Sequence, residues 1–200
     1  MQQARRDTYH HGDAKNALLL TAARLLEEVG ARQLSLRAIA VQAKLSHQAP
    51  YNHFSNKEAL LAELVKSGFK QLENSIRSVV GYPDDTLALE RAGAAYINFA
   101  QSAPALFRIM FSRELVDIRQ FPEAEMAADA AFRSLVDIVE AFAPPAHSDD
   151  LALSAWCLVH GYATLCIELG LEEKTESGRR ARLFAALIKQ QVQGDRQGQH

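Results

Sequence analysis

The stretch SLRAIAVQAKLSHQAPYNHFSNKEALL, residues 35–61, predicts two short helices separated by a tight turn and followed by a third helix. Ser35 is a suitable N-cap for a helix to about Ala43, because its hydroxyl can accept a hydrogen bond from a first-turn backbone N–H. The helix carries an apolar stripe that consists of Leu36, Ile39 and Ala40. Since this spacing puts the three side chains on one face, we expect that face to pack against another helix.

The residues after Ala43 predict the turn and the second helix. Residues 43–46 form a turn that buries Leu45 and offers Ser46 as the next N-cap. Residues 47–54 predict a helix of one to two turns whose exposed side is polar, aromatic and small. Residues 55–58 then start a long amphipathic helix. This order predicts a helix-turn-helix, in which the second helix can lie in the major groove of DNA.

The same stretch resembles the TetR family of bacterial transcriptional regulators in three blocks: Ser/Thr-x-Arg-x-Ile-Ala, Tyr-x-His-Phe and Lys-Glu-x-Leu-Leu. The matching residues are Ser35, Arg37, Ile39, Ala40, Tyr51, His53, Phe54, Lys57, Glu58, Leu60 and Leu61. Lys44 departs from the family, which usually has Gly at this turn position. We expect Lys44 to be held at a positive φ, at a cost of roughly 1 kcal/mol. Pro50 replaces a usually apolar residue near the fourth helical position, and we interpret it as structural.

Candidate DNA contacts lie at the ends of these helices. Gln48 can pair with adenine, and His47 can donate to guanine or to a phosphate. The resemblance implies that Tyr51 and His53 touch phosphates, although each is also compatible with a place in the core. Lys57, and Ser35 or Arg37 at the preceding helix, can hold a phosphate together with backbone N–H groups. The full candidate set is Ser35, Arg37, Ser46, His47, Gln48, Ala49, Tyr51, His53 and Lys57.

The N-terminal sequence ARRDTYHHGD, residues 4–13, is compatible with two interpretations. One is an arm that enters the minor groove of DNA, and the other is a disordered leader. The pair His10 and His11 has no further ligands at suitable spacing, so we expect no metal site there. We expect no cofactor elsewhere.

The charge distribution supports binding to DNA. The net charge is −2, but residues 1–80 carry 11 Lys and Arg against 7 Asp and Glu, whereas residues 81–200 carry 11 against 17. A positive N-terminal part is suited to phosphates. Cys157 and Cys166 lie on one predicted helix and cannot bridge each other, which indicates a reduced, cytoplasmic protein. No signal peptide is recognisable, and no apolar run approaches the roughly 20 residues that span a membrane.

Helical periodicity continues along nearly the whole chain, so the expected fold class is all-α. The first helix has a stripe of Leu18, Ala22, Leu25, Leu26 and Val29, and Gly30 ends it. We expect an arm and helix-turn-helix domain over 1–55, a linking helix over about 56–80 that breaks at Gly81-Tyr82-Pro83, and a ligand-binding and dimerisation domain over 81–193. The remaining residues, 194–200, are expected to be a disordered tail.

Within the second domain, the sequence predicts five further helical segments. Asp84 or Asp85 can cap the first, and Pro104 starts the short second one, ALFRIMF. A helix from about Glu123 to Phe142 stops at Pro144-Pro145, because proline cannot continue the backbone hydrogen bonds. Ser148 or Asp149 opens the next helix, which reaches about Leu169. The last helix runs from about Thr175 to Val192.

The C-terminal half resembles a TetR subgroup whose ligand domain has a Trp…His-Gly pattern, here Trp156, His160 and Gly161. Trp156 and His160 are four residues apart and share one helix face. We expect a pocket with apolar walls and one polar group, which would bind an apolar or aromatic effector. A fully packed core with a hydrogen-bonded histidine would have the same sequence. The candidate ligand-binding residues are Tyr96, Phe99, Phe107, Met110, Phe111, Trp156 and His160.

The last two helices are the candidate dimer interface, because leucines recur on them at intervals of four or seven. The candidate interface residues are Leu151, Leu158, Leu165, Leu183 and Leu187, with Leu169 and Ile188 on the same stripes. The resemblance implies a four-helix bundle across a twofold axis. The two helix-turn-helix domains of the dimer would then reach two half-sites in successive major grooves, about 34–36 Å apart, so the operator would be palindromic.

These features predict a homodimeric repressor that a small molecule releases from double-stranded DNA. Activation or corepression by the effector are alternatives. A helical adaptor that binds only protein is another, although the positive N-terminal part argues against it. An enzyme that uses Cys157 with His160 lacks an oxyanion site and an orienting group, so we expect no enzyme activity.

Overall fold

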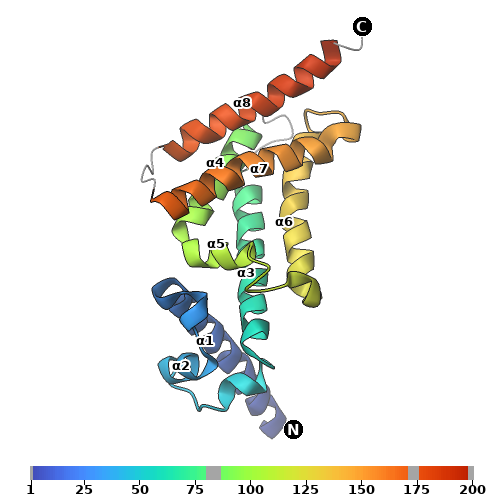
Figure 1. Cartoon of the computed structure of the whole chain (residues 1–200). Coiled ribbons are helices and arrows are strands. Elements are labelled where there is room, and N and C mark those ends of the chain that lie inside the picture. Colours follow the sequence, from blue (N-terminus) through green and yellow to red (C-terminus); the bar gives the residue numbers. More distant parts are fainter. Residues whose placement is uncertain (1, 80–86, 171–175, 198–200) are drawn as a thin grey trace. The chain divides into compact units, whose positions relative to one another are not determined.

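The computed structural model describes residues 2–79, 87–170 and 176–197, and its regular elements within these ranges are all helical (Figure 1). The all-α fold class is therefore confirmed. The elements are α1 (Gln2–Gln33), α2 (Leu36–Gln42), the 3₁₀ helix η1 (Ala49–Asn52), α3 (Lys57–Ser78), α4 (Ala88–Ser102), α5 (Pro104–Met110), the 3₁₀ helix η2 (Ile118–Gln120), α6 (Pro122–Glu140), α7 (Pro145–Leu169) and α8 (Glu176–Gln197).

Contacts divide the chain into two compact units. The first unit comprises residues 1–68 and 105–125, and the second comprises residues 69–104 and 126–200. The helix α3 contributes to both units. These units are groups of residues in contact, and their boundaries differ from those of the expected domains. Residues 105–125, which were expected in the second domain, belong to the same unit as the helix-turn-helix. The limits of the functional domains stay a prediction.

The helix α2 begins and ends as its sequence predicts. The hydroxyl of Ser35 accepts a hydrogen bond from the backbone N–H of Ala38 (3.2 Å), which confirms the N-cap. At the other end, the N–H of Lys44 donates to the Val41 carbonyl (3.1 Å) and that of Leu45 donates to the Ala40 carbonyl (2.9 Å). This pair of bonds is a Schellman motif. Lys44 has a φ of 56°, so its expected positive φ is confirmed.

The second helix of the motif is shorter than predicted. Residues 47 and 48 lie in a turn, and only Ala49–Asn52 form a helix, of the 3₁₀ type. Pro50 explains part of this difference. It is the second residue of η1, where its missing N–H breaks no helical bond, and not the fourth as expected. Its ring is buried, and its carbonyl accepts hydrogen bonds from the N–H groups of His53 (3.0 Å) and Phe54 (2.8 Å).

Several predicted helix ends differ from the structure. The helix α7 starts at Pro145, earlier than Ser148 or Asp149, because proline at the first helical position has no N–H to satisfy. The helix α8 continues past Gly194 to Gln197, where a disordered tail was expected. Val29, which was expected on the buried stripe of the first helix, is 41% exposed, and Gly30 interrupts α1 just after it with a φ of 74°. The caps at Asp84 or Asp85 and the break at Gly81-Tyr82-Pro83 lie outside the described residues.

The N-terminal residues differ from the disordered leader that was one interpretation of their sequence, whereas the groove-binding arm stays a prediction. The helix α1 starts at Gln2, so the region expected to be a groove-binding arm or a disordered leader is helical. Residues 2–11 contain Gln, Ala and Arg, which favour helix, and the glycine at position 12 is tolerated within a helix at a modest cost.

Within the first unit, charged groups connect α1, α3 and the segment 105–125. Glu27 of α1 accepts hydrogen bonds from the backbone N–H groups of Ala105 (3.0 Å) and Leu106 (2.9 Å), the first turn of α5. Its carboxylate therefore satisfies two N–H groups that have no partner within α5.

Gly68 of α3 lies so close to Met110 that an added Cβ would be 2.6 Å from the Met110 sulfur, so glycine permits this approach.

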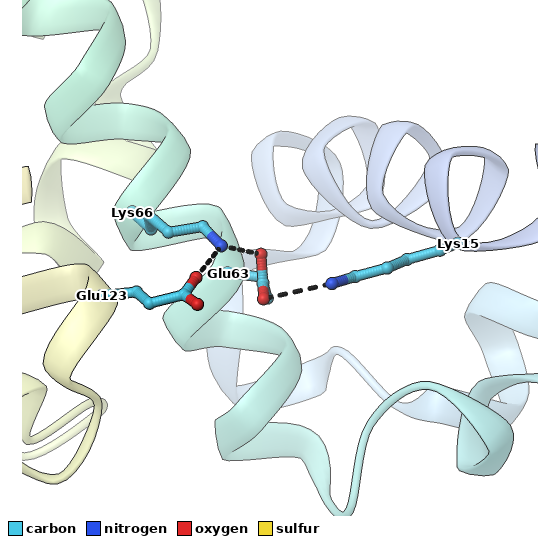
Figure 2. Close-up of polar contacts among 4 residues, drawn as sticks. All are labelled: Lys15, Glu63, Lys66 and Glu123. Carbon is cyan, nitrogen blue, oxygen red and sulfur yellow. Dashed lines mark hydrogen bonds and ion pairs between the residues drawn. The ribbon is translucent and has the colours of Figure 1, made fainter. Parts of the chain in front are cut away.

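A second set of charges in the first unit is the ion-pair chain, which joins α1, α3 and the start of α6 (Figure 2). Lys15 lies 3.2 Å from Glu63, which lies 2.6 Å from Lys66, and Lys66 lies 2.7 Å from Glu123. Burial alone would raise the pKa of Glu63, but its hydrogen bonds to Lys66 and Lys15 lower it below the usual value. Burial would lower the pKa of Lys66, but the two carboxylates raise it.

The second unit is built on apolar contacts among α4, α7 and α8, which lie side by side (Figure 1). Gly93 of α4 allows a close approach, since an added Cβ would lie 3.2 Å from the Cβ of Ala181 and 3.3 Å from Val159. Tyr96, Ile97 and Ala100 of α4 are buried at this contact face. Ion pairs of this unit, such as that between Arg182 and Glu90, involve exposed arginines.

Candidate DNA-binding surface and ligand-binding cluster

The helix-turn-helix presents polar side chains to solvent on a buried apolar support. Leu36, Ile39, Ala40 and Phe54 are buried, as predicted from their spacing. Most of the candidate DNA contacts are exposed, and Tyr51 is 47% exposed. The interpretation of Tyr51 as a core aromatic is therefore wrong. The exposed candidates are Ser35, Arg37, Ser46, His47, Gln48 and Tyr51, whereas Ala49, His53 and Lys57 are half-buried.

Three of these candidates have partners within the protein. The Ser35 hydroxyl caps α2, and the ammonium of Lys57 donates to the carbonyl of Arg32 (3.1 Å) near the end of α1. His53 packs edge-on against Phe54, with ring centroids 6.3 Å apart. Lys57 therefore has a structural bond in the absence of DNA, which the sequence did not reveal. The N-cap of α3 is Asn56, whose side-chain oxygen accepts a hydrogen bond from the Ala59 N–H (2.8 Å).

In the second unit, Tyr96, Trp156 and His160 come together as predicted. The Tyr96 hydroxyl and Nδ1 of His160 lie 2.8 Å apart in a hydrogen bond, and the rings of Tyr96 and Trp156 are 5.3 Å apart, edge to face. Phe132 of α6 also packs on Trp156, with the two ring centroids 5.7 Å apart. Sequence analysis missed Phe132, because nothing distinguished it from other apolar residues of an amphipathic helix.

The polar atoms of this cluster are sheltered from water. Burial raises the pKa of Tyr96 far above its usual value, only partly offset by a hydrogen bond with Trp156, so its hydroxyl stays protonated. Burial lowers the pKa of His160, which favours a neutral imidazole. Thr164, one helical turn after His160, has a buried hydroxyl that makes no hydrogen bond with any described residue. Its position on the same helix face was the available signal in the sequence.

Space beside the cluster is small. An apolar crevice of about 20 Å³ lies among α4, α7 and α8, and Tyr96 is the one candidate ligand-binding residue among its described lining residues. This volume holds roughly one water molecule. In the first unit, an open groove of about 280 Å³ lies between α3 and residues 120–124. The apolar crevice is therefore too small to hold a ligand of ordinary size.

The remaining ligand candidates divide between the units. Phe99 belongs to the second unit and is buried. Phe107, Met110 and Phe111 belong to the first, where the rings of Phe107 and Phe111 lie 5.0 Å apart. Phe107 and Met110 are buried there, and Phe111 is 37% exposed.

The candidate dimer residues also fall into two groups. Leu165, Leu183 and Leu187 are 52%, 49% and 47% exposed. Leu158 is half-buried. Leu151 is 6% exposed in the single chain, so it differs from the exposed leucines, and its place in an interface stays a prediction. Sequence analysis missed Leu153, which is 53% exposed on α7.

Two further expectations concern metal ions and membranes. Among the described residues, no group of three or more His, Cys, Asp and Glu side chains is placed to hold a metal ion. The helix α7 is long and apolar enough to cross a membrane by composition, with a window of mean hydropathy 1.3 between residues 146 and 169. The statement that no apolar run approaches this length is therefore wrong. Core helices of soluble proteins have the same length and composition, so one such helix is weak evidence for a membrane span.

The chain is similar to several known proteins. It is 22% identical over 163 residues to the uncharacterized HTH-type transcriptional regulator YerO of Bacillus subtilis (strain 168). The match covers 78% of this chain and 56% of YerO, so the chain spans little more than half the length of that relative. A protein of unknown function from Rhodococcus sp. RHA1 has a similar structure, with a TM-score of 0.73 and 26% identity over 92% of this chain and 97% of that one.

Two more distant structures share the fold. PfmR, a TetR family transcriptional regulator from Thermus thermophilus, has a TM-score of 0.64 and 19% identity, covering 86% of this chain and 97% of its own. A TetR variant from Acinetobacter baumannii AYE, solved in complex with minocycline, has a TM-score of 0.60 and 22% identity. The match covers 92% of this chain and 97% of the variant.

Family descriptions match both parts of the chain. Residues 18–64 match "Bacterial regulatory proteins, tetR family", a range that contains α2, η1 and the exposed candidate contacts. Residues 89–190 match "Tetracyclin repressor-like, C-terminal domain", which covers half of the chain and contains the Tyr96, Trp156 and His160 cluster. With the helix-turn-helix geometry, these matches show that the chain belongs to the TetR family of bacterial regulatory proteins.

Proposed function

We propose that the protein is a cytoplasmic transcriptional repressor, which binds a palindromic operator as a homodimer and is released by a small-molecule effector. The observation that carries the DNA-binding part is the exposed surface of Arg37, His47, Gln48 and Tyr51 on a buried helix-turn-helix framework. Gln48 is suited to adenine and His47 to guanine or phosphate. Tyr51, with His53, would position the head on the phosphate backbone.

The homodimer is supported by the exposed leucines of α7 and α8. Leu153, Leu165 and Leu169 of α7, and Leu183 and Leu187 of α8, are each at least 47% exposed in the single chain. A twofold contact buries the same surface on both copies, so leucines on two helices of each chain can form a four-helix interface. Two heads would then occupy half-sites about 34–36 Å apart.

The effector site is proposed at the cluster of Tyr96, Trp156 and His160. Aromatic walls favour an apolar or aromatic molecule, and the hydroxyl of Thr164 together with the His160 ring offers polar groups to orient it. We assign this cluster to the Trp…His-Gly subgroup of the family. Because the crevice is small, the effector has to favour a rearranged state, and a tenfold change in DNA affinity needs about 1.4 kcal/mol of coupling.

The first experiment selects bound duplexes from a random pool and then titrates the enriched sequence with wild type, Tyr51→Ala and Leu20→Ala. We expect an enriched palindrome that Tyr51→Ala binds at least tenfold more weakly. Leu20→Ala, which removes an exposed side chain from α1, serves as the control and should bind normally. If no sequence is enriched, or if Tyr51→Ala binds like wild type, the proposed DNA surface is wrong.

The dimer and the effector need separate measurements. Leu183→Glu combined with Leu187→Glu should convert a dimer to a monomer in analytical ultracentrifugation and abolish binding to the palindrome.

A screen of aromatic and apolar compounds should find one that releases wild type from the operator. A compound that strengthens DNA binding instead would indicate corepression, and one that raises transcription from the bound complex would indicate activation.

A further inference from the structure

The turn between α2 and η1 contains a backbone conformation that its side chain does not favour. Lys44 has a φ of 56° and is the one non-glycine residue with a positive φ in residues 2–79, 87–170 and 176–197. The Schellman bonds to Val41 and Ala40 require this conformation at position 44. Glycine adopts it without steric cost, whereas a residue with a Cβ does not. The backbone therefore explains the conformation and leaves the choice of lysine unexplained.

Packing does not explain the lysine either. The side chain of Lys44 is exposed, and its ammonium makes no ion pair or hydrogen bond with any residue in the described parts of the chain. Lysines of α1 and α3 in the same unit do have such partners, since Lys15 and Lys66 belong to the ion-pair chain and Lys57 binds the Arg32 carbonyl. A strained residue without an internal partner points to a role outside the folded chain.

The position of Lys44 indicates that role. It comes directly before Leu45 and Ser46, where the turn leads into the exposed residues His47 and Gln48. If His47 and Gln48 enter the major groove as proposed, a flexible ammonium at this place can reach a phosphate of the strand that borders it. Lysine holds phosphates as a mobile point charge, so a left-handed turn does not prevent the contact.

We infer that Lys44 is a DNA phosphate contact, for which the chain retains a lysine at a position where glycine would give a more stable fold. This inference rests on the proposed function, because it needs the helix-turn-helix to bind DNA. It predicts opposite effects of one substitution, a gain in stability and a loss in affinity. If Lys44 does not contact DNA, its replacement by glycine should raise the stability without lowering the affinity for DNA.

The test measures thermal unfolding and DNA binding of wild type, Lys44→Gly, Lys44→Asn and Lys44→Arg. Lys44→Gly should raise the Tm by about 2–4 °C, because it relieves the strained turn. Because each copy of the proposed dimer contributes one Lys44, the affinity of Lys44→Gly should fall about 60-fold at 0.1 M salt, for operator and random duplexes alike, and the slope of log K against log salt should decrease by about 1.8. Lys70→Ala, which removes an exposed lysine of α3, is the control for net charge.

The other variants separate charge from backbone. Lys44→Asn tolerates the positive φ but has no charge, so it should lose affinity like Lys44→Gly, whereas Lys44→Arg should keep wild-type affinity and salt slope. If wild type binds its operator and all Lys44 variants share its affinity and slope, the inference is wrong although the proposed function holds. If wild type binds no duplex at low salt, both fail.

Discussion

Both units of this protein have an apolar core, but the contacts that connect their segments differ. In the first unit, carboxylates and ammonium groups connect segments that are far apart in sequence, through Glu27 and through the ion-pair chain. In the second unit, α4 lies against α7 and α8 through apolar contacts that Gly93 brings close and that Tyr96 completes. Charged contacts respond to salt and pH, whereas apolar contacts respond to volume. The two units should therefore differ in what destabilises them.

The largest effect is expected from Tyr96→Ala in the second unit. Tyr96 is 2% exposed, so its removal leaves a cavity and deprives His160 of its hydrogen-bond partner. We expect the free energy of unfolding to fall by about 3–5 kcal/mol, measured by urea denaturation. Tyr96→Phe should cost only about 1 kcal/mol, because it removes the hydroxyl alone.

Tyr51→Ala is the matched control for this prediction, since Tyr51 is 47% exposed. It should change the stability by no more than about 0.5 kcal/mol while it impairs DNA binding. Equal losses of stability for the two tyrosine variants would contradict the distinction between a buried and a DNA-facing tyrosine.

The next largest effect is expected from Glu27 in the first unit. Its carboxylate accepts two N–H groups of the first turn of α5, so Glu27→Ala leaves both without this partner. We expect a loss of about 1–2 kcal/mol, and a smaller loss for Glu27→Gln, which keeps an acceptor without the charge. Glu28→Ala removes an exposed carboxylate that pairs only with Arg24 among the described residues, and it should cost less than about 0.5 kcal/mol. Similar losses at the two positions would argue against the role of Glu27.

Much of the fold was predictable because local signals agree with it. Ser35 caps α2 as its sequence predicts, and the apolar spacing of the following residues places Leu36 and Ile39 in the core. The positive φ of Lys44 was predictable for a different reason, since the resemblance showed that glycine is usual at that position. The residues that determine the cap, the buried stripe and the turn of α2 are therefore close to one another in the sequence.

The rest depends on contacts between segments distant in sequence. Glu27 looks like any charged residue of an exposed helix face, because its partners at residues 105 and 106 are far along the chain. Leu151 and Leu165 occupy the same predicted stripe, yet the first is buried in its own chain and the second is exposed. Periodicity identifies the apolar side of a helix, but it does not say which neighbour covers it.

A smaller effect is expected from the ion-pair chain, and it should depend on salt. Lys66→Ala removes the ammonium between Glu63 and Glu123, and we expect a loss of stability of up to about 1 kcal/mol in low salt, which decreases in 1 M salt. Lys70→Ala, which removes an exposed lysine of the same helix, should have no such salt dependence. An unchanged loss across salt concentrations would indicate lost packing instead of lost charge.

The same network has a defined pH dependence. Its lysine partners lower the pKa of Glu63 and of Glu123 in the folded protein, so their contribution is present above the unfolded pKa and is lost as the pH falls through the folded pKa. The raised pKa of Lys66 acts at the alkaline end, where its contribution is lost as the pH rises through the folded pKa. In Lys66→Ala, both losses should be smaller than in wild type.

The smallest expected effect is the titration of His160 in the second unit. Burial lowers its pKa below the usual 6.5, so the unfolded chain binds a proton there more readily than the folded protein does. The free energy of unfolding should therefore fall as the pH is lowered from about 6.5 towards the folded pKa, by at most about 1.4 kcal/mol per pH unit for this one proton. His160→Gln should flatten the pH profile in that window. Urea denaturation between pH 5 and 7 makes the comparison, and identical slopes for wild type and His160→Gln would show that the half-buried His160 does not contribute to the pH dependence of stability.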